Sequence, residues 1–146
     1  MKTFDTKSIL VKKSKIDETL ARPGRSGKTL LEPFRSFALE NKLPFSILED
    51  TAVSNDAEVH MQEGDLWFCL QGRARFVCGG KLVEPQYRLN TDGSINKNEL
   101  YASGIIGGTE FSLEVGDWLW IPAGKSHQHG AEATARLMII KIPLSV

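Results

Sequence analysis

The sequence predicts an all-β fold with a single domain, and three observations support this prediction. From Phe34 onward, short runs of β-prone residues alternate with turn residues, a pattern typical of β-sandwiches and barrels. After residue 32, no amphipathic pattern of helix length occurs. A chain of 146 residues suits one hydrophobic core. We therefore expect an N-terminal arm over residues 1–32 and one β-domain over residues 33–146.

The expected arm is basic and has short helical and extended parts. Residues 1–28 contain eight basic and three acidic residues, which indicates a solvated segment. A short helix is expected over residues 14–22, with Ser14 as its N-terminal cap. Pro23, Gly24 and Gly27 then end the helix and form a polar loop.

The β-domain is expected to consist of short strands joined by turns. The tryptophans Trp67, Trp118 and Trp120 alternate within their runs and are expected to lie in the core. Residues 86–108 are rich in Asn, Asp, Gly and Ser, so we expect an extended loop that covers one end of the domain. The expected strands are 35–40, 44–50, 57–61, 65–72, 73–80, 81–89, 110–122 and 135–144.

Composition excludes several classes of function. Basic and acidic residues balance at 18 each, so the chain lacks the overall charge of a nucleic-acid binder. No run of about 20 apolar residues is present to span a membrane, and the first residues lack the apolar core of a signal peptide. The only cysteines, Cys69 and Cys78, lie in apolar runs and do not indicate a disulfide framework. We expect a cytoplasmic protein.

Three histidines stand at the ends of β-prone runs. In a strand, residues two apart share a face, so Glu58 and His60 point the same way. His127 and His129 do so as well if their segment is extended. Two imidazoles and a carboxylate with open positions form the facial arrangement of non-haem iron sites. The pattern therefore predicts a divalent-metal site, and the alternative is a barrel whose histidines only form hydrogen bonds.

The segment from Gly116 to His127 resembles the second motif of the cupins, which are small jelly-roll β-barrels. That motif runs Gly, five residues, Pro, one residue, Gly, two residues, His. Gly116, Pro122, Gly124 and His127 reproduce this spacing in full. The Asn that usually follows this His by four residues is replaced by Ala131.

The first cupin motif runs His, one residue, His, four residues, Glu, six residues, Gly. Counted back from Gly72, these positions hold Asp65, His60 and Glu58. The resemblance implies a metal site of His60, His127, Glu58 and Asp65, in which Glu58 replaces the first His and Asp65 the usual Glu. Because Asp is one methylene shorter than Glu, we expect Asp65 to reach a metal only through water. Gln62 and His129 are reserve ligands.

The resemblance implies a cupin jelly-roll barrel that binds Fe, Mn, Zn or Ni and acts on a small oxygen-rich substrate. Dioxygenase, isomerase, decarboxylase and lyase activities all occur in this fold, with Glu58 or His129 expected here to move protons. A non-catalytic small-molecule or sugar-binding cupin and a metal-free epimerase-type enzyme are the alternatives. Apolar residues on both faces of residues 65–72 also predict a homodimer.

Overall fold

A computed structural model describes residues 7–144, so the first six residues of the expected arm lie outside the described residues. Within the described part, neither helix is long and apolar enough to cross a membrane. The elements are, in chain order, α1 Lys13–Leu20, β1 Gly27–Leu30, α2 Phe34–Glu40, β2 Phe45–Ser54, β3 Ala57–His60, β4 Glu63–Gln71, β5 Arg73–Cys78, β6 Lys81–Leu82, β7 Gln86–Leu89, β8 Ile95–Ala102, β9 Ile105–Ile106, β10 Thr109–Glu114, β11 Trp118–Ile121 and β12 His127–Pro143.

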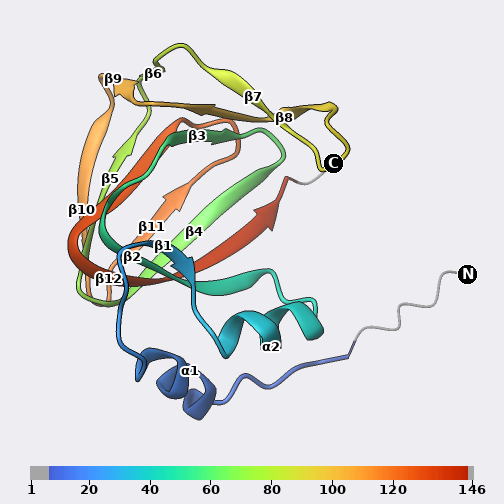
Figure 1. Ribbon diagram of the computed structural model, residues 1–146, viewed down its shortest axis with the longest axis vertical. Coiled ribbons are helices and arrows are strands. Elements are labelled where there is room, and N and C mark those ends of the chain that lie inside the picture. Colours follow the sequence, from blue (N-terminus) through green and yellow to red (C-terminus); the bar gives the residue numbers. More distant parts are fainter. Residues whose placement is uncertain (1–6, 145–146) are drawn as a thin grey trace, which may run out of the picture.

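Strand β12 joins the walls of an antiparallel barrel (Figure 1). It pairs with β2, β3, β4 and β5, and it bends through a register shift between Ala131 and Thr134. The two sheets expected of a jelly roll are therefore continuous, as one ten-stranded sheet, and β6 and β9 form a separate pair. The predicted all-β barrel is confirmed.

The barrel interior is filled by alternate residues of the facing strands. Trp67 of β4 is 3% exposed and meets Phe76 of β5 edge-on at 5.1 Å between ring centroids. The prediction that Trp67 lies in the core is confirmed. The same prediction is wrong for Trp118 and Trp120, which are 59% and 51% exposed. Leu119 and Ile121 take the inward positions of β11 instead.

The two helices pack against the outside of the barrel, below the strands in Figure 1. The predicted helix in the arm is confirmed as α1, but Ser14 does not cap it. Lys12 occupies the cap position without a side-chain hydrogen bond. The arm also supplies β1, which pairs antiparallel with β2 and extends the barrel sheet.

Residues 35–40, expected to be a strand, form most of α2, so that prediction is wrong. Phe34 and Ala38 lie four residues apart on one face of the helix, and both are buried. They pack on Ile47 of β2 together with Leu31. The segment is too short for its helical period to stand out from the sequence, and contact with the barrel decides its conformation.

The extended loop expected over residues 86–108 is also wrong, since this segment contains β7, β8 and β9. Strands β7 and β8 form a hairpin whose turn includes Asp92 and Gly93, and Gly93 has a φ of +86°. Strand β8 pairs with β3, so the hairpin continues the barrel wall next to Glu58 and His60.

The outer face of β4 is partly covered by the chain itself. Leu70 of β4 and Met138 of β12 pack against the helices, and Phe68 stacks on Trp118 at 4.4 Å between centroids. These contacts account for part of the apolar pattern on which the expected homodimer was based. The homodimer stays a prediction.

A buried ion pair fixes the connection between α1 and β1. Arg136 donates from Nε to Glu49 Oε1 at 2.9 Å, and the two side chains are 6% and 0% exposed. The same guanidinium donates to the backbone carbonyls of Leu20 and Arg22, and Glu49 accepts a hydrogen bond from Arg25 N. These contacts set the path by which the chain enters β1.

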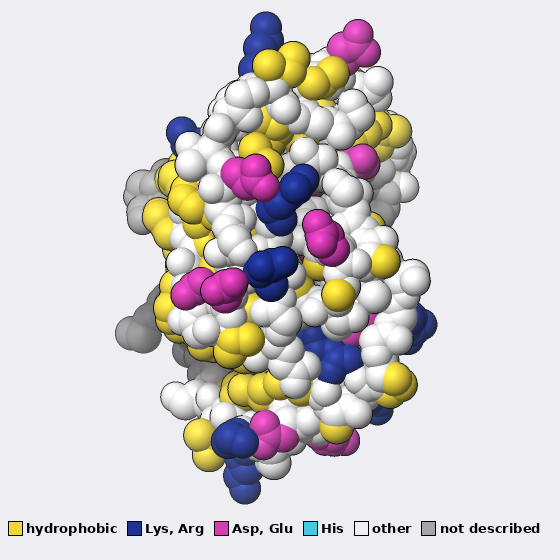
Figure 2. All heavy atoms as spheres, turned by 90° about the vertical axis from the view of Figure 1, so that its left-hand side faces the viewer, with side chains coloured by type: hydrophobic (Ala, Val, Ile, Leu, Met, Phe, Trp, Pro, Cys, Tyr) yellow, Lys and Arg dark blue, Asp and Glu magenta, His cyan; other side chains and the backbone are white. Residues whose placement is uncertain are grey.

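We predict that Glu49→Gln lowers the free energy of unfolding by about 3 kcal/mol, because it leaves the Arg136 charge buried and unpaired. Glu110→Gln is the control, since Glu110 pairs with Arg75 at 3.3 Å with both side chains more than half exposed. This pair lies on the β5–β10 face, where charges of both signs are interspersed (Figure 2). The control should cost less than about 1 kcal/mol. Urea denaturation measures both, and equal losses would contradict the prediction.

Candidate metal centre

The four residues assigned by the sequence as metal ligands converge inside the barrel. Glu58 and His60 lie on one face of β3, with side chains 18% and 12% exposed. His127 begins β12 opposite Glu58, and its ring centroid is 5.0 Å from that of His60. Ligand atoms of Glu58, His60 and His127 all lie within 4.8 Å of one another. The expected approach of the two histidines to within reach of one ion is therefore observed.

Asp65 enters the same space from β4. Its Oδ2 lies 3.4 Å from His127 Nε2 and 3.6 Å from His60 Nε2, and its side chain is 1% exposed. Its Oδ1 accepts a hydrogen bond from Lys141 Nζ at 2.8 Å. The shorter side chain of Asp65 thus still brings one carboxylate oxygen to the two imidazoles.

The tautomers follow from the partners of the other ring nitrogens. His127 Nδ1 lies 3.1 Å from the Lys125 carbonyl oxygen, which can only accept, so Nδ1 carries the proton. His60 Nδ1 lies against the Glu99 carboxylate, which fixes its proton in the same way. In the neutral rings, both Nε2 lone pairs then face the Asp65 oxygen.

Two of these atoms are left without a hydrogen bond. Asp65 Oδ2 and His127 Nε2 are both buried and have no hydrogen-bond partner among the described residues. Buried polar groups are normally paired, because an unpaired one costs about 1–3 kcal/mol. A carboxylate oxygen facing an imidazole lone pair is a contact between two acceptors. A cation between them satisfies both, so the residues present fit a divalent metal ion.

Burial and neighbouring charges shift the pKa values of Glu58, His60 and His127. Burial raises the pKa of Glu58, but the contact with His60 and the charges of Lys28 and Arg88 outweigh it and hold that pKa below its usual range. Burial lowers the pKa of His60, yet its contacts with Glu58 and Glu99 raise it overall. Burial lowers the pKa of His127, which keeps this ring neutral. Glu58 and His127 are therefore in the forms that bind a metal.

Two residues of the β7–β8 hairpin complete the site, and sequence analysis missed both. Glu99 pairs directly with His60 across β8 and β3. Arg88 donates to Glu58 Oε1 at 2.6 Å and lies over the Tyr101 ring at 4.8 Å. Residues 95–102 do not alternate between apolar and polar types, so the sequence contains no clear signal for this strand or for the position of Glu99 beside His60.

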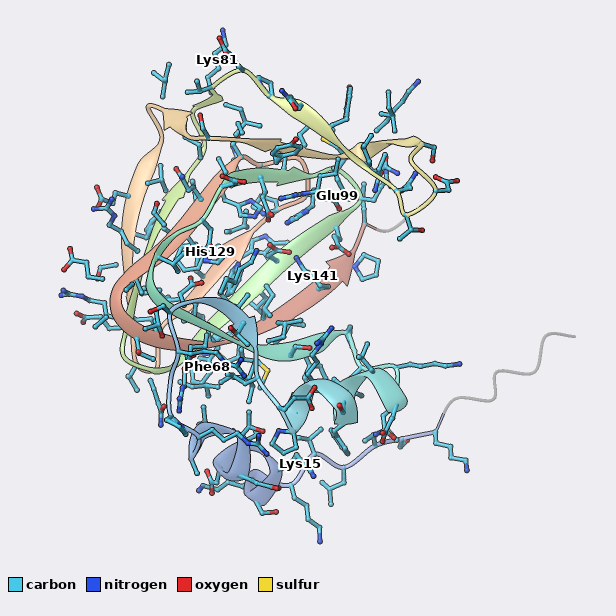
Figure 3. All side chains as sticks on the ribbon, in the orientation of Figure 1. Lys15, Phe68, Lys81, Glu99, His129 and Lys141 are labelled. Atoms are coloured by element: carbon cyan, nitrogen blue, oxygen red, sulfur yellow. The ribbon has the colours of Figure 1, made fainter. Side chains whose placement is uncertain are left out.

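His129, expected as a catalytic residue or reserve ligand, lies deeper in the barrel (Figure 3). It is 6% exposed, and its Nδ1 is 2.5 Å from Asp50 Oδ2. Asn55 Nδ2 contacts the same Asp50 side chain at 3.0 Å, and Trp67 lies against the imidazole ring at 4.9 Å between centroids. His129 is absent from the groups of possible metal ligands found in residues 7–144.

Gln62 and Glu63 lie near the turn between β3 and β4, outside the buried ligand group. Gln62, the second reserve ligand, is exposed and lies near Asn98. Glu63 begins β4, and its Oε1 lies 3.7 Å from Lys141 Nζ. Together with His60 and Glu99, Glu63 forms a second possible ligand group that shares His60 with the first.

No protein-family model and no curated protein matches the chain. Among solved structures, a protein of Bacillus halodurans is 15% identical and matches 94% of this chain and 83% of its own, with a TM-score of 0.51. A cupin protein of Bacteroides fragilis is 11% identical and matches 98% of this chain and 88% of its own, with a TM-score of 0.48.

The EutQ protein of Clostridium difficile is 13% identical over 69% of this chain, with a TM-score of 0.43. This chain covers 52% of EutQ, or about half of its length. In this chain the Gly116 to His127 spacing ends at a histidine that is buried in the barrel. The likeness to the Bacillus halodurans protein agrees with the jelly-roll β-barrel that the sequence predicts.

Proposed function

We propose that the chain is a metal-binding cupin that holds one divalent cation through His60, His127 and Glu58. The observation that carries this proposal is the pair of buried atoms Asp65 Oδ2 and His127 Nε2, which are 3.4 Å apart and lack hydrogen-bond partners among the described residues. Asp65 supplies either a fourth ligand or an acceptor beside the ion. Imidazole and carboxylate donors suit Fe, Mn, Zn or Ni.

The proposed activity is that of a divalent-metal-dependent enzyme on a small oxygen-rich substrate, in the dioxygenase, isomerase, decarboxylase or lyase class. When bound, the cation would supply Lewis-acid or dioxygen chemistry. The chain supplies orientation and proton transfer. Asp50 holds His129 by Nδ1, which leaves Nε2 as the atom that accepts or returns a proton. Glu58 is also expected from the sequence to move protons, but its contacts with His60 and Arg88 hold its pKa low, which suits a metal ligand better than a proton donor.

The His129–Asp50 contact also favours a second candidate, a metal-free enzyme of the epimerase type. In such an enzyme a carboxylate orients a histidine base, and the 2.5 Å contact between Asp50 Oδ2 and His129 Nδ1 has this form. A non-catalytic small-molecule binder is the third possibility. Activity that survives complete removal of metal would favour the epimerase type over the metal-dependent enzyme.

We predict that Glu58→Gln reduces metal retention after dialysis more than Glu63→Gln. Glu58 belongs to the buried ligand group with His60 and His127, whereas Glu63 belongs to the more exposed group with His60 and Glu99. Asp65→Asn should give an intermediate loss, because one Asp65 oxygen is already held by Lys141. Elemental analysis of the dialysed proteins measures the retained metal, and Glu110→Gln is the surface control.

Each result of this comparison has a definite meaning. Full retention by Glu58→Gln would show that Glu58 is no ligand. A larger loss in Glu63→Gln would place the ion in the second group instead. Failure of the wild-type protein to retain Fe, Mn, Zn or Ni would overturn the metal proposal.

We also predict that Glu99→Gln weakens binding of Co²⁺ by about 10- to 100-fold, because Glu99 orients His60 through Nδ1. Lys97→Gln is the control on the same strand, since Lys97 is exposed. Titration followed by the visible absorption of bound Co²⁺ gives both the affinity and the ligand geometry. An unchanged affinity and spectrum in Glu99→Gln would contradict this role.

A further inference from the structure

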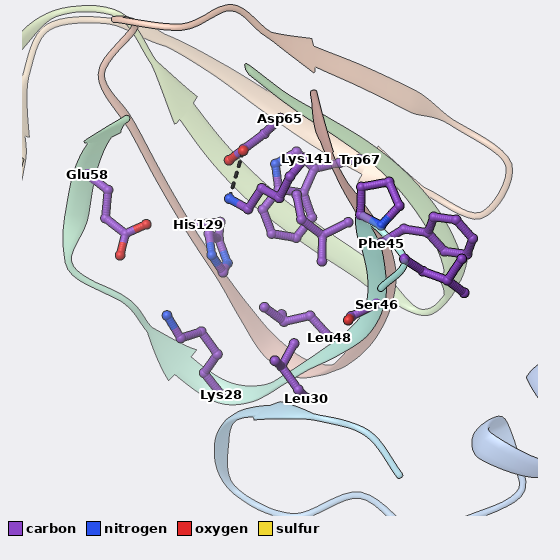
Figure 4. A pocket seen from close by; sticks show the side chains of 13 residues that line it. Lys28, Leu30, Phe45, Ser46, Leu48, Glu58, Asp65, Trp67, His129 and Lys141 are labelled. Carbon is purple, nitrogen blue, oxygen red and sulfur yellow. Dashed lines mark hydrogen bonds and ion pairs between the residues drawn. The ribbon is translucent and has the colours of Figure 1, made fainter. Parts of the chain in front are cut away.

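A pocket of about 310 Å³ opens beside the proposed metal centre. This volume is at the small end of the range for ligand sites, which is about 300–1,000 Å³. Its polar end is formed by Glu58, Asp65 and His129, and its wall by apolar side chains (Figure 4). The apolar side chains that line it are Leu30, Leu43, Pro44, Phe45, Leu48, Trp67 and Ile139.

Strand β1 brings a lysine into this pocket from the N-terminal part of the chain. Lys28 and Leu30 alternate with Thr29, so they share one face of β1, and both line the pocket. The amino group of Lys28 points into the space between Glu58 and His129 (Figure 4). The arm thus forms part of the site, in contrast to the purely solvated segment expected from its composition.

The other charged groups around the pocket already have partners. Arg88 Nη2 lies 2.6 Å from Glu58 Oε1, Lys141 Nζ lies 2.8 Å from Asp65 Oδ1, and Asp50 holds His129. Within residues 7–144, Lys28 has no carboxylate within the 4.0 Å of an ion pair. Lys28 is exposed and faces Glu58, which already pairs with Arg88, so its positive charge is available to an anion beside the apolar wall.

We infer that this pocket binds a small organic carboxylate with an apolar body. The carboxylate lies between Lys28 and the metal centre, and the apolar body rests on Leu30, Leu48 and Ile139. A neutral sugar fits this lining less well, because most of the wall offers no hydrogen-bonding group. This inference names a substrate class for the proposed function. It rests on that function because the carboxylate of the ligand would lie beside the proposed metal ion.

The test uses 4-methyl-2-oxopentanoate as probe and its neutral methyl ester as the comparison, in calorimetric titrations of the full chain. Lys28→Met should weaken binding of the acid by about tenfold, because it removes the charged amino group while keeping an unbranched apolar side chain of similar size. Lys28→Arg should largely retain binding. Lys81→Met, a change of an exposed lysine on β6, is the control and should have no effect.

Each titration is carried out on metal-loaded and on chelator-treated protein. If Lys28→Met binds the acid as tightly as the unsubstituted protein does, the inference is overturned and the metal proposal stands. Equal affinity for acid and ester, or no binding of the acid in either form, would also overturn it. A Lys28-dependent preference for the acid that persists without metal supports the pocket even if the metal proposal fails.

Discussion

Inside the barrel, the Asp65 carboxylate faces the Nε2 atoms of His60 and His127 at 3.6 and 3.4 Å, with only 1% of its side chain exposed. This oxygen is buried without a hydrogen-bond partner among the described residues, and Lys141 engages only the other one. A buried carboxylate beside imidazole lone pairs requires a positive charge between them, supplied by a proton or by a metal ion. The convergence of Glu58, His60 and His127 on the same space fits the second of these solutions.

Strand β12 supplies residues to every part of the site. His127 at its start reaches the centre, His129 two residues later is held by Asp50, and Lys141 near its end neutralises one oxygen of Asp65. Between them, Arg136 fixes the backbone that leads into β1. The same strand therefore positions the proposed metal centre, His129 and the N-terminal wall of the pocket. Residues far apart in the sequence become one site because β12 crosses both walls of the barrel.

Local spacing was enough to predict the barrel and the convergence of Glu58, His60, Asp65 and His127 inside it, because each cupin motif lies within a single short segment. It was not enough for contacts made between distant segments. Glu99 meets His60 across 39 residues, and Arg88 meets Glu58 across 30, inside a segment whose turn residues indicated a loop. The helix α2 was missed for a related reason, since contact with the barrel outweighs the β-propensity of a short run.

The central claim is that a divalent cation lies between His60, His127 and Glu58. The most direct measurement is anomalous X-ray diffraction from crystals of the metal-loaded protein, recorded above and below the absorption edge of the metal. We expect one anomalous peak about 2.0–2.3 Å from the Nε2 atoms of both histidines, with a Glu58 oxygen at a similar distance. Crystals that contain the metal but show no peak at this position, or a peak only beside Glu63 and Glu99, would contradict the claim.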